Sequence, residues 1–297
     1  MRLARPGRGA EPVSLHGLRG LRTAIAAPLR LDRSAPAMET RNLTIPTPAG
    51  SLRARFYRPD KSDDVGPCLV FFHGGGFVLC DLETHDALCR RLADAGRMRV
   101  LSVEYRLAPE APFPAQLDDG EAAVRWAIRA SADLQIDPAG LLLGGDSAGA
   151  YIAVATAAQL NCEQEGSIAA LVLIYPLLEL RDEAWNEGFT ADTRFVGRAA
   201  VGFIRQQLQL TGSPPSLAGI GLDPLPPMLI VVGGPLDPCR ADAMRLAARM
   251  REAAKPMTLL EFPRLPHGFA SLTHLSRASQ RAVTQIGRAA AVMTADA

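Results

Sequence analysis

The sequence lacks an excess of charge of either sign, and it lacks any long apolar run. Its 297 residues include 32 lysines and arginines against 31 acidic residues, which gives a formal net charge of +1. This balance provides no bulk attraction to the phosphates of a nucleic acid, so we expect no nucleic-acid partner. No apolar stretch approaches the roughly 20 residues that a membrane-spanning helix needs, so no membrane span is predicted.

Paired cysteines are missing as well. The chain has five cysteines, an odd number, and none of them forms a Cys-x-x-Cys pair. This pattern argues against both a disulfide framework and a zinc site. Free cysteines are typical of a reducing compartment, so we expect a cytoplasmic location.

The N-terminal stretch has its own composition, because it is rich in arginine and poor in acidic residues. A transit peptide would share this composition. A secretory signal would not, since the only apolar run, 24–29, is short and is broken by Pro28. We favour an N-terminal arm that contains one or two short helices.

Periodicity predicts that strands and helices alternate along most of the chain. Alternating apolar residues on both sides of a Pro-Ala-Gly turn indicate an antiparallel hairpin at 39–46 and 51–58. Strands buried on both faces read as continuous apolar runs, and helices as apolar residues that recur on one side. The other predicted strands are 68–72, 100–103, 141–143, 169–175, 227–232 and 257–262, and the predicted helices are 87–95, 117–130, 150–158, 193–210, 240–253 and 272 to the C-terminus.

This alternation predicts an α/β fold with a mostly parallel central sheet and helices on both faces. The segment 177–221 interrupts the pattern, since it is polar and irregular before it becomes helical. It is too long for a plain connection between two elements. We therefore expect an insertion that lies over the edge of the sheet.

The most informative stretch is Gly145-Asp146-Ser147-Ala148-Gly149, which joins a predicted strand to a predicted helix. So sharp a turn strains its central residue, and glycines two positions before and after it avoid a collision. The strain lifts the Ser147 hydroxyl out of the sheet, and the N-terminus of the following helix points N–H groups at the same place. Two interpretations stay open: a catalytic serine, or a serine that only caps the helix.

A serine nucleophile needs a base, and the base needs an acid that orients it. On this kind of sheet the order along the chain is serine, acid, histidine, and only His267 and His274 follow Ser147. His267 lies in a loop directly after a predicted strand, where sites on open α/β sheets form. His274 falls at the start of the predicted last helix, so His267 is the predicted base.

The acid should follow the strand at 227–232. Asp237 lies in the loop that leaves this strand, and it is our first choice. A turn before Pro238 or an N-cap for the next helix is the structural alternative for Asp237. Asp242 is the second choice, although it lies within that helix, and Asp223 precedes the strand.

The oxyanion formed during acyl transfer needs preorganised hydrogen-bond donors. The backbone amide of Ala148 is one candidate, and the glycine run at 74–76 supplies others. A flexible glycine turn is the structural alternative, whereas a phosphate loop is disfavoured because no Gly-Lys-Ser/Thr follows. His73 opens this loop and is predicted to orient it rather than to catalyse.

Taken together, these motifs resemble the α/β-hydrolases of the hormone-sensitive-lipase family, the bacterial family IV esterases. The resemblance runs from Asn42 to Phe269 and implies an α/β-hydrolase fold. It also implies a catalytic triad and an oxyanion hole, the former made by Ser147, Asp237 and His267 and the latter by Gly75, Gly76 and Ala148. The motifs are His73-Gly74-Gly75-Gly76-Phe77, Asp81-Leu82-Glu83-Thr84-His85-Asp86, Tyr105-Arg106-Leu107-Ala108-Pro109-Glu110, the serine turn, Asp237-Pro238 and Pro266-His267-Gly268-Phe269.

The same resemblance implies a small helical cap built from the N-terminal arm and the insertion. The predicted division is an arm at 1–38 that contributes to the cap, a core at 39–183 and 222–297, and a cap insertion at 184–221. Two departures from the family concern the site. Cys80 stands where glycine is usual, and Cys239 stands where leucine is usual.

The sequence thus predicts a serine carboxylesterase that acts on a small-molecule ester through an acyl-enzyme, without cofactor or metal. Phe77 and Cys80 are predicted to line the acyl pocket and to restrict it to short chains. An amidase or deacetylase with the same triad is an alternative. A non-catalytic ligand receptor on this fold is a further one, although such receptors lose a triad member. The oligomeric state is left open, and a homodimer is one state the sequence allows.

Overall fold

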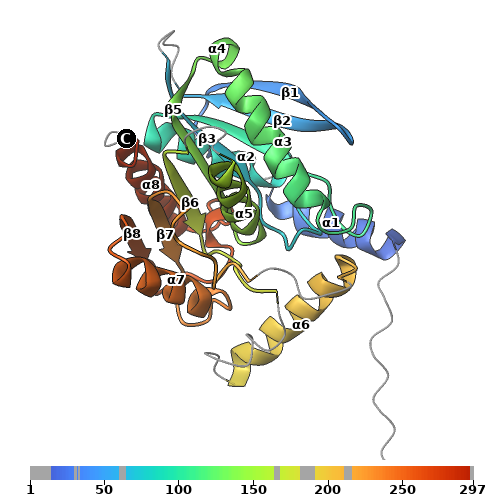
Figure 1. Ribbon diagram of the computed structural model, residues 1–297. Coiled ribbons are helices and arrows are strands. Elements are labelled where there is room, and N and C mark those ends of the chain that lie inside the picture. The colour runs from blue at the N-terminus through green and yellow to red at the C-terminus, as the bar shows by residue number, and fades with distance from the viewer. Residues whose placement is uncertain are drawn as a thin grey trace, which may run out of the picture.

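One sheet forms the centre of the protein, as Figure 1 shows for the computed structural model. The structure describes residues 15–29, 32, 34–59, 65–163, 168–180, 191–210 and 216–294, and for 191–198 it describes the backbone alone. The strands within these residues are β1 (Glu39–Thr47), β2 (Gly50–Arg58), β3 (Gly66–Phe72), β4 (Arg99–Glu104), β5 (Ile136–Asp146), β6 (Ala170–Ile174), β7 (Met228–Val232) and β8 (Met257–Glu261).

The strands lie in the order β1-β2-β4-β3-β5-β6-β7-β8. β2 pairs antiparallel with both β1 and β4, and every other pairing is parallel. Parallel strands all end at one edge of the sheet, so the loops after β3, β5, β7 and β8 meet there. The predicted α/β fold with a mostly parallel sheet is confirmed.

Helices cover both faces of the sheet (Figure 1). One face packs against α2 (Leu82–Gly96) and α8 (Arg277–Val292), and the other against α3 (Ala115–Arg129), α5 (Ala148–Cys162) and α7 (Arg240–Glu252). Alternate residues of β5 serve the two cores, since Leu141 and Leu143 belong to one apolar cluster and Leu142 to the other. A strand buried on both faces must be apolar throughout, which accounts for the continuous runs in the sequence.

Two helices start five residues away from their predicted first residues, 87 and 272. α2 begins at Leu82 because Asp81 caps it: the Asp81 carboxylate accepts a hydrogen bond from the Thr84 amide, and the Thr84 side chain bonds back to the Asp81 amide. The prediction that the last helix starts at Leu272 is wrong. Ser276 caps α8, so this helix begins at Arg277 and leaves His274 in the preceding turn.

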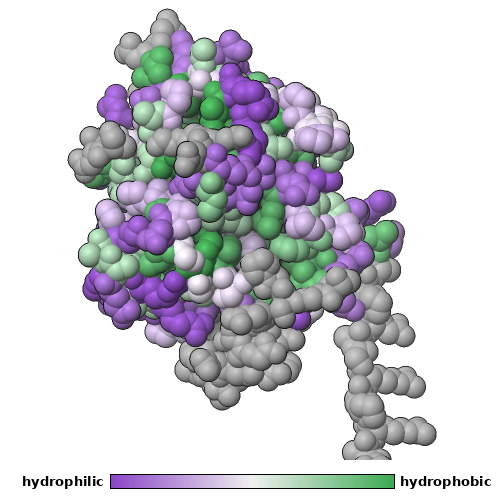
Figure 2. Space-filling model, viewed as in Figure 1, coloured by the Kyte–Doolittle hydropathy of each residue, from purple (hydrophilic) through white to green (hydrophobic). Residues whose placement is uncertain are grey.

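Two further helices lie outside these layers. α1 (Leu15–Leu29) falls within the predicted arm, and α6 (Ala191–Gln207) falls within the predicted insertion. Residues 1–14 of the arm, and 184–190 and 211–215 of the insertion, lie outside the described residues. None of the described helices combines the length and the apolar character needed to cross a membrane. Figure 2 shows hydrophilic and hydrophobic residues mixed over one face of the molecule.

Candidate active site

Ser147 occupies the turn between β5 and α5 and has a strained backbone, with φ 52° and ψ −115°. The turn is so tight that a Cβ on Gly145 would overlap the backbone of Gly149, and one on Gly149 would overlap the backbone of Phe72. Only glycine fits at both positions. The strained serine and its two glycines are the geometry expected of a nucleophile at a strand-to-helix turn.

Three side chains selected from the sequence lie within hydrogen-bond reach of one another. His267 Nε2 is 3.0 Å from Ser147 Oγ, and His267 Nδ1 is 2.8 Å from Asp237 Oδ1. The Asp237 side chain is fully buried, while that of His267 is 29% exposed. A buried acid that holds a partly exposed imidazole against a serine hydroxyl is the arrangement of a serine hydrolase triad.

The loops after β7 and β8 position Asp237 and His267, the predicted acid and base. Within the first loop, the Cys239 amide donates a hydrogen bond to Asp237 Oδ1 at 2.9 Å. The Gly234 amide donates to the Leu265 carbonyl at 2.7 Å, which ties the two loops together. The Tyr175 ring packs against the His267 ring, with centroids 4.8 Å apart. Neighbouring parallel strands therefore bring together two residues that are far apart in the sequence.

The alternative acids have other partners. Asp242 forms an ion pair with Arg245 on α7. Asp223 is exposed and lies 3.6 Å from the Lys255 ammonium. Neither lines the cavity around Ser147, and neither does His274.

The glycine loop after β3 lies beside the serine. Gly75 and Gly76 have φ angles of 105° and 63°, and both line the cavity that contains Ser147. Within the described residues, neither amide donates a hydrogen bond to the protein. These amides, with that of Ala148 at the start of α5, are available to an oxyanion.

A buried network that sequence reasoning missed holds this loop. Asp146 Oδ1 accepts a hydrogen bond from the Gly74 amide at 2.7 Å and lies 3.1 Å from His85 Nε2. Asp146 Oδ2 accepts a hydrogen bond from the Tyr175 hydroxyl at 3.2 Å. Burial alone would raise the pKa of Asp146, but the charge of His85 and the hydrogen bonds from His85 and Gly74 hold it below the ordinary value of 3.8. Asp146 is thus a buried carboxylate that anchors the start of the glycine loop.

His73 supports the same loop from below. Its ring stacks on Tyr105 with centroids 4.3 Å apart, and Nδ1 lies 2.8 Å from the Gly74 carbonyl oxygen. The Tyr105 hydroxyl donates to the His73 carbonyl at 2.8 Å. Burial, and next the charge of His85, lower the pKa of His73 to about 4. His73 is therefore a neutral residue that packs under the loop, outside the set that lines the cavity.

A cavity of about 570 Å³ opens above Ser147. The glycine loop forms part of its wall. Two helices form another part, α1 with Ile25, Pro28 and Leu29, and α6 with Ala200, Phe203 and Ile204. Cys80 lines this cavity, and its role as a substrate contact stays a prediction. Phe77 does not line the cavity, because its side chain is fully buried and its ring packs edge-on against Tyr151 at 5.7 Å.

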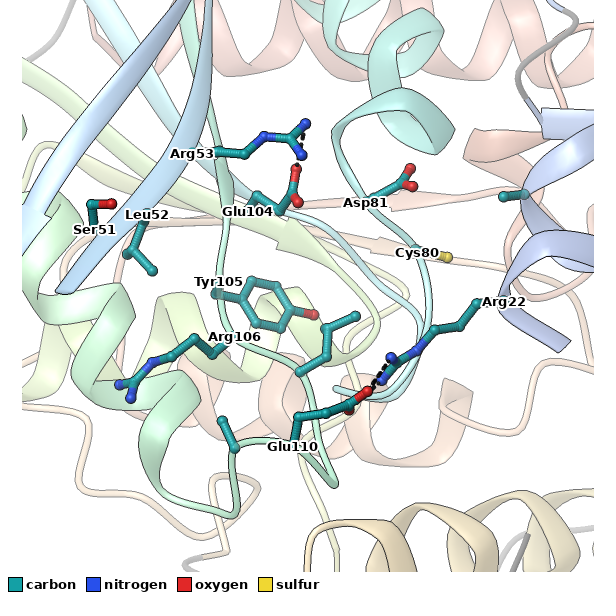
Figure 3. Close-up of a pocket in the computed structure, with 13 residues that line it drawn as sticks. Arg22, Ser51, Leu52, Arg53, Cys80, Asp81, Glu104, Tyr105, Arg106 and Glu110 are labelled. Atoms are coloured by element: carbon teal, nitrogen blue, oxygen red, sulfur yellow. Dashed lines mark hydrogen bonds and ion pairs between the residues drawn. The ribbon is translucent and has the colours of Figure 1, made fainter. Parts of the chain in front are cut away.

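Beside this cavity lies a second one of about 480 Å³, and Cys80 lines both. Figure 3 shows two ion pairs in the second cavity, Arg22 with Glu110 and Arg53 with Glu104. Arg22 of α1 also donates to the carbonyl oxygens of Val78 at 2.7 Å and Ala108 at 2.9 Å. One arginine thus fastens α1 to the end of the glycine loop and to the Tyr105–Glu110 motif.

Comparisons with known proteins agree with this geometry. A family model described as alpha/beta hydrolase fold matches residues 69–271. The carboxylic ester hydrolase LipN of Mycobacterium tuberculosis is 35% identical over 270 residues, which cover 84% of this chain and 69% of the relative. Esterase LipI of the same organism is 31% identical over 264 residues, which cover 84% of this chain and 81% of the relative.

Solved structures show the same relationship. An esterase from Pyrobaculum calidifontis superposes with a TM-score of 0.85 at 29% identity, over 93% of each chain. A thermophilic carboxylesterase cloned from a metagenomic library, EstE1, superposes with a TM-score of 0.83 at 30% identity, over 93% of this chain and 97% of the other. The chain therefore belongs to the alpha/beta hydrolase fold family, among the esterases related to hormone-sensitive lipase.

Proposed function

We propose that this carboxylic ester hydrolase cleaves short-chain acyl esters, with Ser147 as nucleophile, His267 as base and Asp237 as the acid that orients it. The observation that carries the proposal is the unbroken line of hydrogen bonds from Asp237 Oδ1 through the two nitrogens of His267 to Ser147 Oγ. When His267 carries its ring proton on Nδ1 and donates it to Asp237, the lone pair on Nε2 is free to accept the proton of Ser147.

In the first half of the reaction, Ser147 Oγ attacks the ester carbonyl carbon and its proton passes to His267 Nε2. The carbonyl oxygen becomes an anion that the amides of Gly75, Gly76 and Ala148 bind. As the tetrahedral intermediate collapses, His267 returns the proton to the departing alcohol. The acyl group stays on Ser147 as an ester.

In the second half, His267 takes a proton from a water molecule, which attacks the acyl-enzyme carbonyl carbon. A second oxyanion forms at the same amides, and its collapse releases the carboxylic acid while Ser147 recovers its proton. Asp237 stays ionised and stabilises the imidazolium in both halves. The steps use only side chains, backbone amides and water.

Two features of the cavity support the preference for short acyl chains. Ile204 of α6 lies so close to the glycine loop that a Cβ on Gly76 would be 2.7 Å from its Cδ1. Cys80 also lines the cavity, where it fills space that a glycine would leave open, and it adopts a positive φ of 73°. Each methylene that stays buried contributes about 0.8 kcal/mol, so selectivity for chain length ends where this cavity ends.

The location that we propose is cytoplasmic. All five cysteines lie in the described part of the chain and all are free thiols, which supports a reducing compartment. The homodimer that the sequence allows stays a prediction.

The nucleophile is tested with Ser147→Ala, beside Ser131→Ala on α4 (Ser131–Leu134) as a control far from the cavity. We expect the first variant to fold and to lose turnover of p-nitrophenyl acetate, and the second to keep it. A serine-directed phosphonate should add a single mass at Ser147. Substantial turnover by Ser147→Ala, or labelling at another residue, would refute the assignment.

Acyl preference is tested with p-nitrophenyl esters of increasing chain length. We expect kcat/KM to peak between acetyl and hexanoyl, and Cys80→Gly to move the peak to longer chains by opening the cavity wall. Cys89→Gly offers a poor comparison because it lies inside α2, so Cys162→Gly at the exposed end of α5 is the control. A flat profile, or a peak at long chains in the unaltered enzyme, would contradict the short-chain proposal.

A further inference from the structure

Three donors of different chemistry meet at the acid end of the triad. Asp237, Cys239 and His267 offer a carboxylate oxygen, a thiol sulfur and a ring nitrogen, which all lie within 4.8 Å of one another. Nitrogen, sulfur and oxygen donors are the ones that Zn²⁺ takes in tetrahedral sites, at about 2.0–2.3 Å from each. Two of the three residues belong to the proposed triad, whereas Cys239 has no part in it.

The carboxylate has an unused oxygen. Asp237 Oδ1 already accepts hydrogen bonds from His267 Nδ1 and from the Cys239 amide. Asp237 Oδ2 is buried and has no hydrogen-bond partner in the described part of the chain. A buried carboxylate oxygen without a donor is unfavourable until a donor or a cation reaches it.

On one side of Asp237 Oδ2 the neighbouring residue is a glycine, so no side chain covers the oxygen there. Gly233 faces it, and a Cβ at that position would lie 2.8 Å from Oδ2. His267 lines the cavity above Ser147 and its side chain is 29% exposed. Of the three donors, the imidazole is therefore the one that the cavity exposes.

We propose that Asp237, Cys239 and His267 form an inhibitory site for a soft divalent cation such as Zn²⁺ or Cd²⁺. The inference rests on the proposed function, because it is inhibition of that triad which makes the site matter. The cation accepts lone pairs from the carboxylate, from the Cys239 thiolate and from His267 Nδ1. The thiol proton leaves to water, and the Nδ1 proton moves to Nε2.

A cation on His267 Nδ1 stops catalysis because it leaves the ring proton on Nε2. Once Nε2 carries the proton, it cannot accept the proton of Ser147, so acylation has no base. The substrate cavity itself is left open, because the cation lies on the far side of the ring from Ser147. We therefore expect Zn²⁺ to lower kcat much more than it raises KM.

Cys239 makes the site a property of this chain. Leucine is usual at this position in the family that the sequence resembles, and a leucine side chain offers no lone pair. Carboxylate and imidazole alone give two protein donors, whereas Zn²⁺ sites in proteins use three or four. Removal of the thiol should thus weaken the site more than any change at another cysteine.

The first experiment titrates ester turnover with Zn²⁺ and expresses each rate relative to the same variant without metal. We expect Cys239→Ala and Cys239→Leu to raise the half-inhibitory concentration about 10-fold or more, since loss of a ligand weakens a metal site at least as much as loss of a group that only supports a ligand. Cys89→Ala, another buried thiol, should leave it unchanged. Equal sensitivity of wild type and both Cys239 variants would overturn the proposal.

The second experiment needs no activity. Cd²⁺ bound to a thiolate absorbs in the ultraviolet, so we expect this band when Cd²⁺ is added to the Ser147→Ala protein, and its loss in Ser147→Ala/Cys239→Leu. A band of equal strength in both proteins, or no band in either, would overturn the metal site. Neither result would alter the assignment of Ser147, which turnover and labelling test separately.

Discussion

Two histidine–carboxylate pairs flank Ser147, and they differ in what the histidine faces. His267 lies 2.8 Å from Asp237, and His85 lies 3.1 Å from Asp146. Both carboxylates are buried, but the side chain of His267 is 29% exposed while that of His85 is 2% exposed. His267 contacts its carboxylate through Nδ1 and presents Nε2 to the serine, whereas His85 contacts its carboxylate through Nε2.

A histidine beside a buried carboxylate is therefore not enough to make a catalytic base. What matters is which nitrogen is left over and whether it meets a nucleophile. The carboxylate oxygens of Asp146 contact the Gly74 amide, His85 and the Tyr175 hydroxyl. The Asp146–His85 pair therefore holds the glycine loop in place. Tyr175 joins the two pairs, because its hydroxyl bonds Asp146 while its ring packs against His267.

The largest expected effect separates the two histidines. His267→Ala should lower kcat by about 10⁶-fold, because a triad base has no substitute. His85→Gln keeps a donor near Asp146 and should lower kcat by about 10-fold or less, as expected of a residue that acts through the loop. Steady-state turnover of p-nitrophenyl acetate measures both. Comparable losses would break the distinction between the pairs.

The next effect separates the acids. Asp237→Asn should lower kcat by about 10⁴-fold, because the amide holds the imidazole in the wrong tautomer and stabilises no imidazolium. Asp242→Asn, which alters an ion pair on α7, is the matched control and should change kcat little. Small and equal losses in both variants would mean that another group orients His267.

A smaller effect is expected at the second pair. Asp146→Asn keeps an oxygen for the Gly74 amide but removes the charge that His85 faces. The glycine loop should then be less well fixed, and kcat should fall by about 10- to 100-fold, less than the loss of a whole oxyanion donor. KM should change little, since the cavity walls remain. A fall as large as that of Asp237→Asn would show that Asp146 takes part in proton transfer.

The smallest effect is on acid stability. The folded-state pKa of Asp146 lies below its ordinary value of 3.8, so the carboxylate stabilises the fold above that value. This stabilisation is lost as the pH falls from the ordinary value through the lower folded-state pKa. Urea unfolding at neutral and acidic pH should therefore show a steeper loss of stability in wild type than in Asp146→Asn. Parallel curves would contradict a charged Asp146 in the folded protein.

Much of this arrangement follows from local sequence. The glycines around Ser147 indicate a backbone that tolerates no Cβ, and the apolar runs indicate strands buried on both faces. The order serine, acid, histidine then left few residues to choose from, and the chosen Asp237 and His267 lie next to Ser147 in the structure. These signals are local or depend on chain order, so a sequence can display them.

The second pair lacked such a signal. Asp146 and His85 both belong to motifs that were noted, but their contact joins β5 to α2 and depends on tertiary packing. The sequence also carries no signal for the direction in which a side chain points in an irregular segment. Phe77 follows three glycines and has a positive φ of 63°, and its side chain lies in the core instead of the cavity. His274 was misplaced because the Ser276 cap, and not the apolar Leu272, sets the start of α8.

The rate at which a serine-directed phosphonate modifies Ser147 tests the central claim most directly. The reagent needs an activated serine but no completed turnover, and intact mass reports a single event. Wild type and His85→Gln should be labelled at similar rates, while His267→Ala should be labelled slower by several orders of magnitude. Labelling of His267→Ala at the wild-type rate, or loss of labelling in His85→Gln alone, would contradict the assignment of His267 as the base.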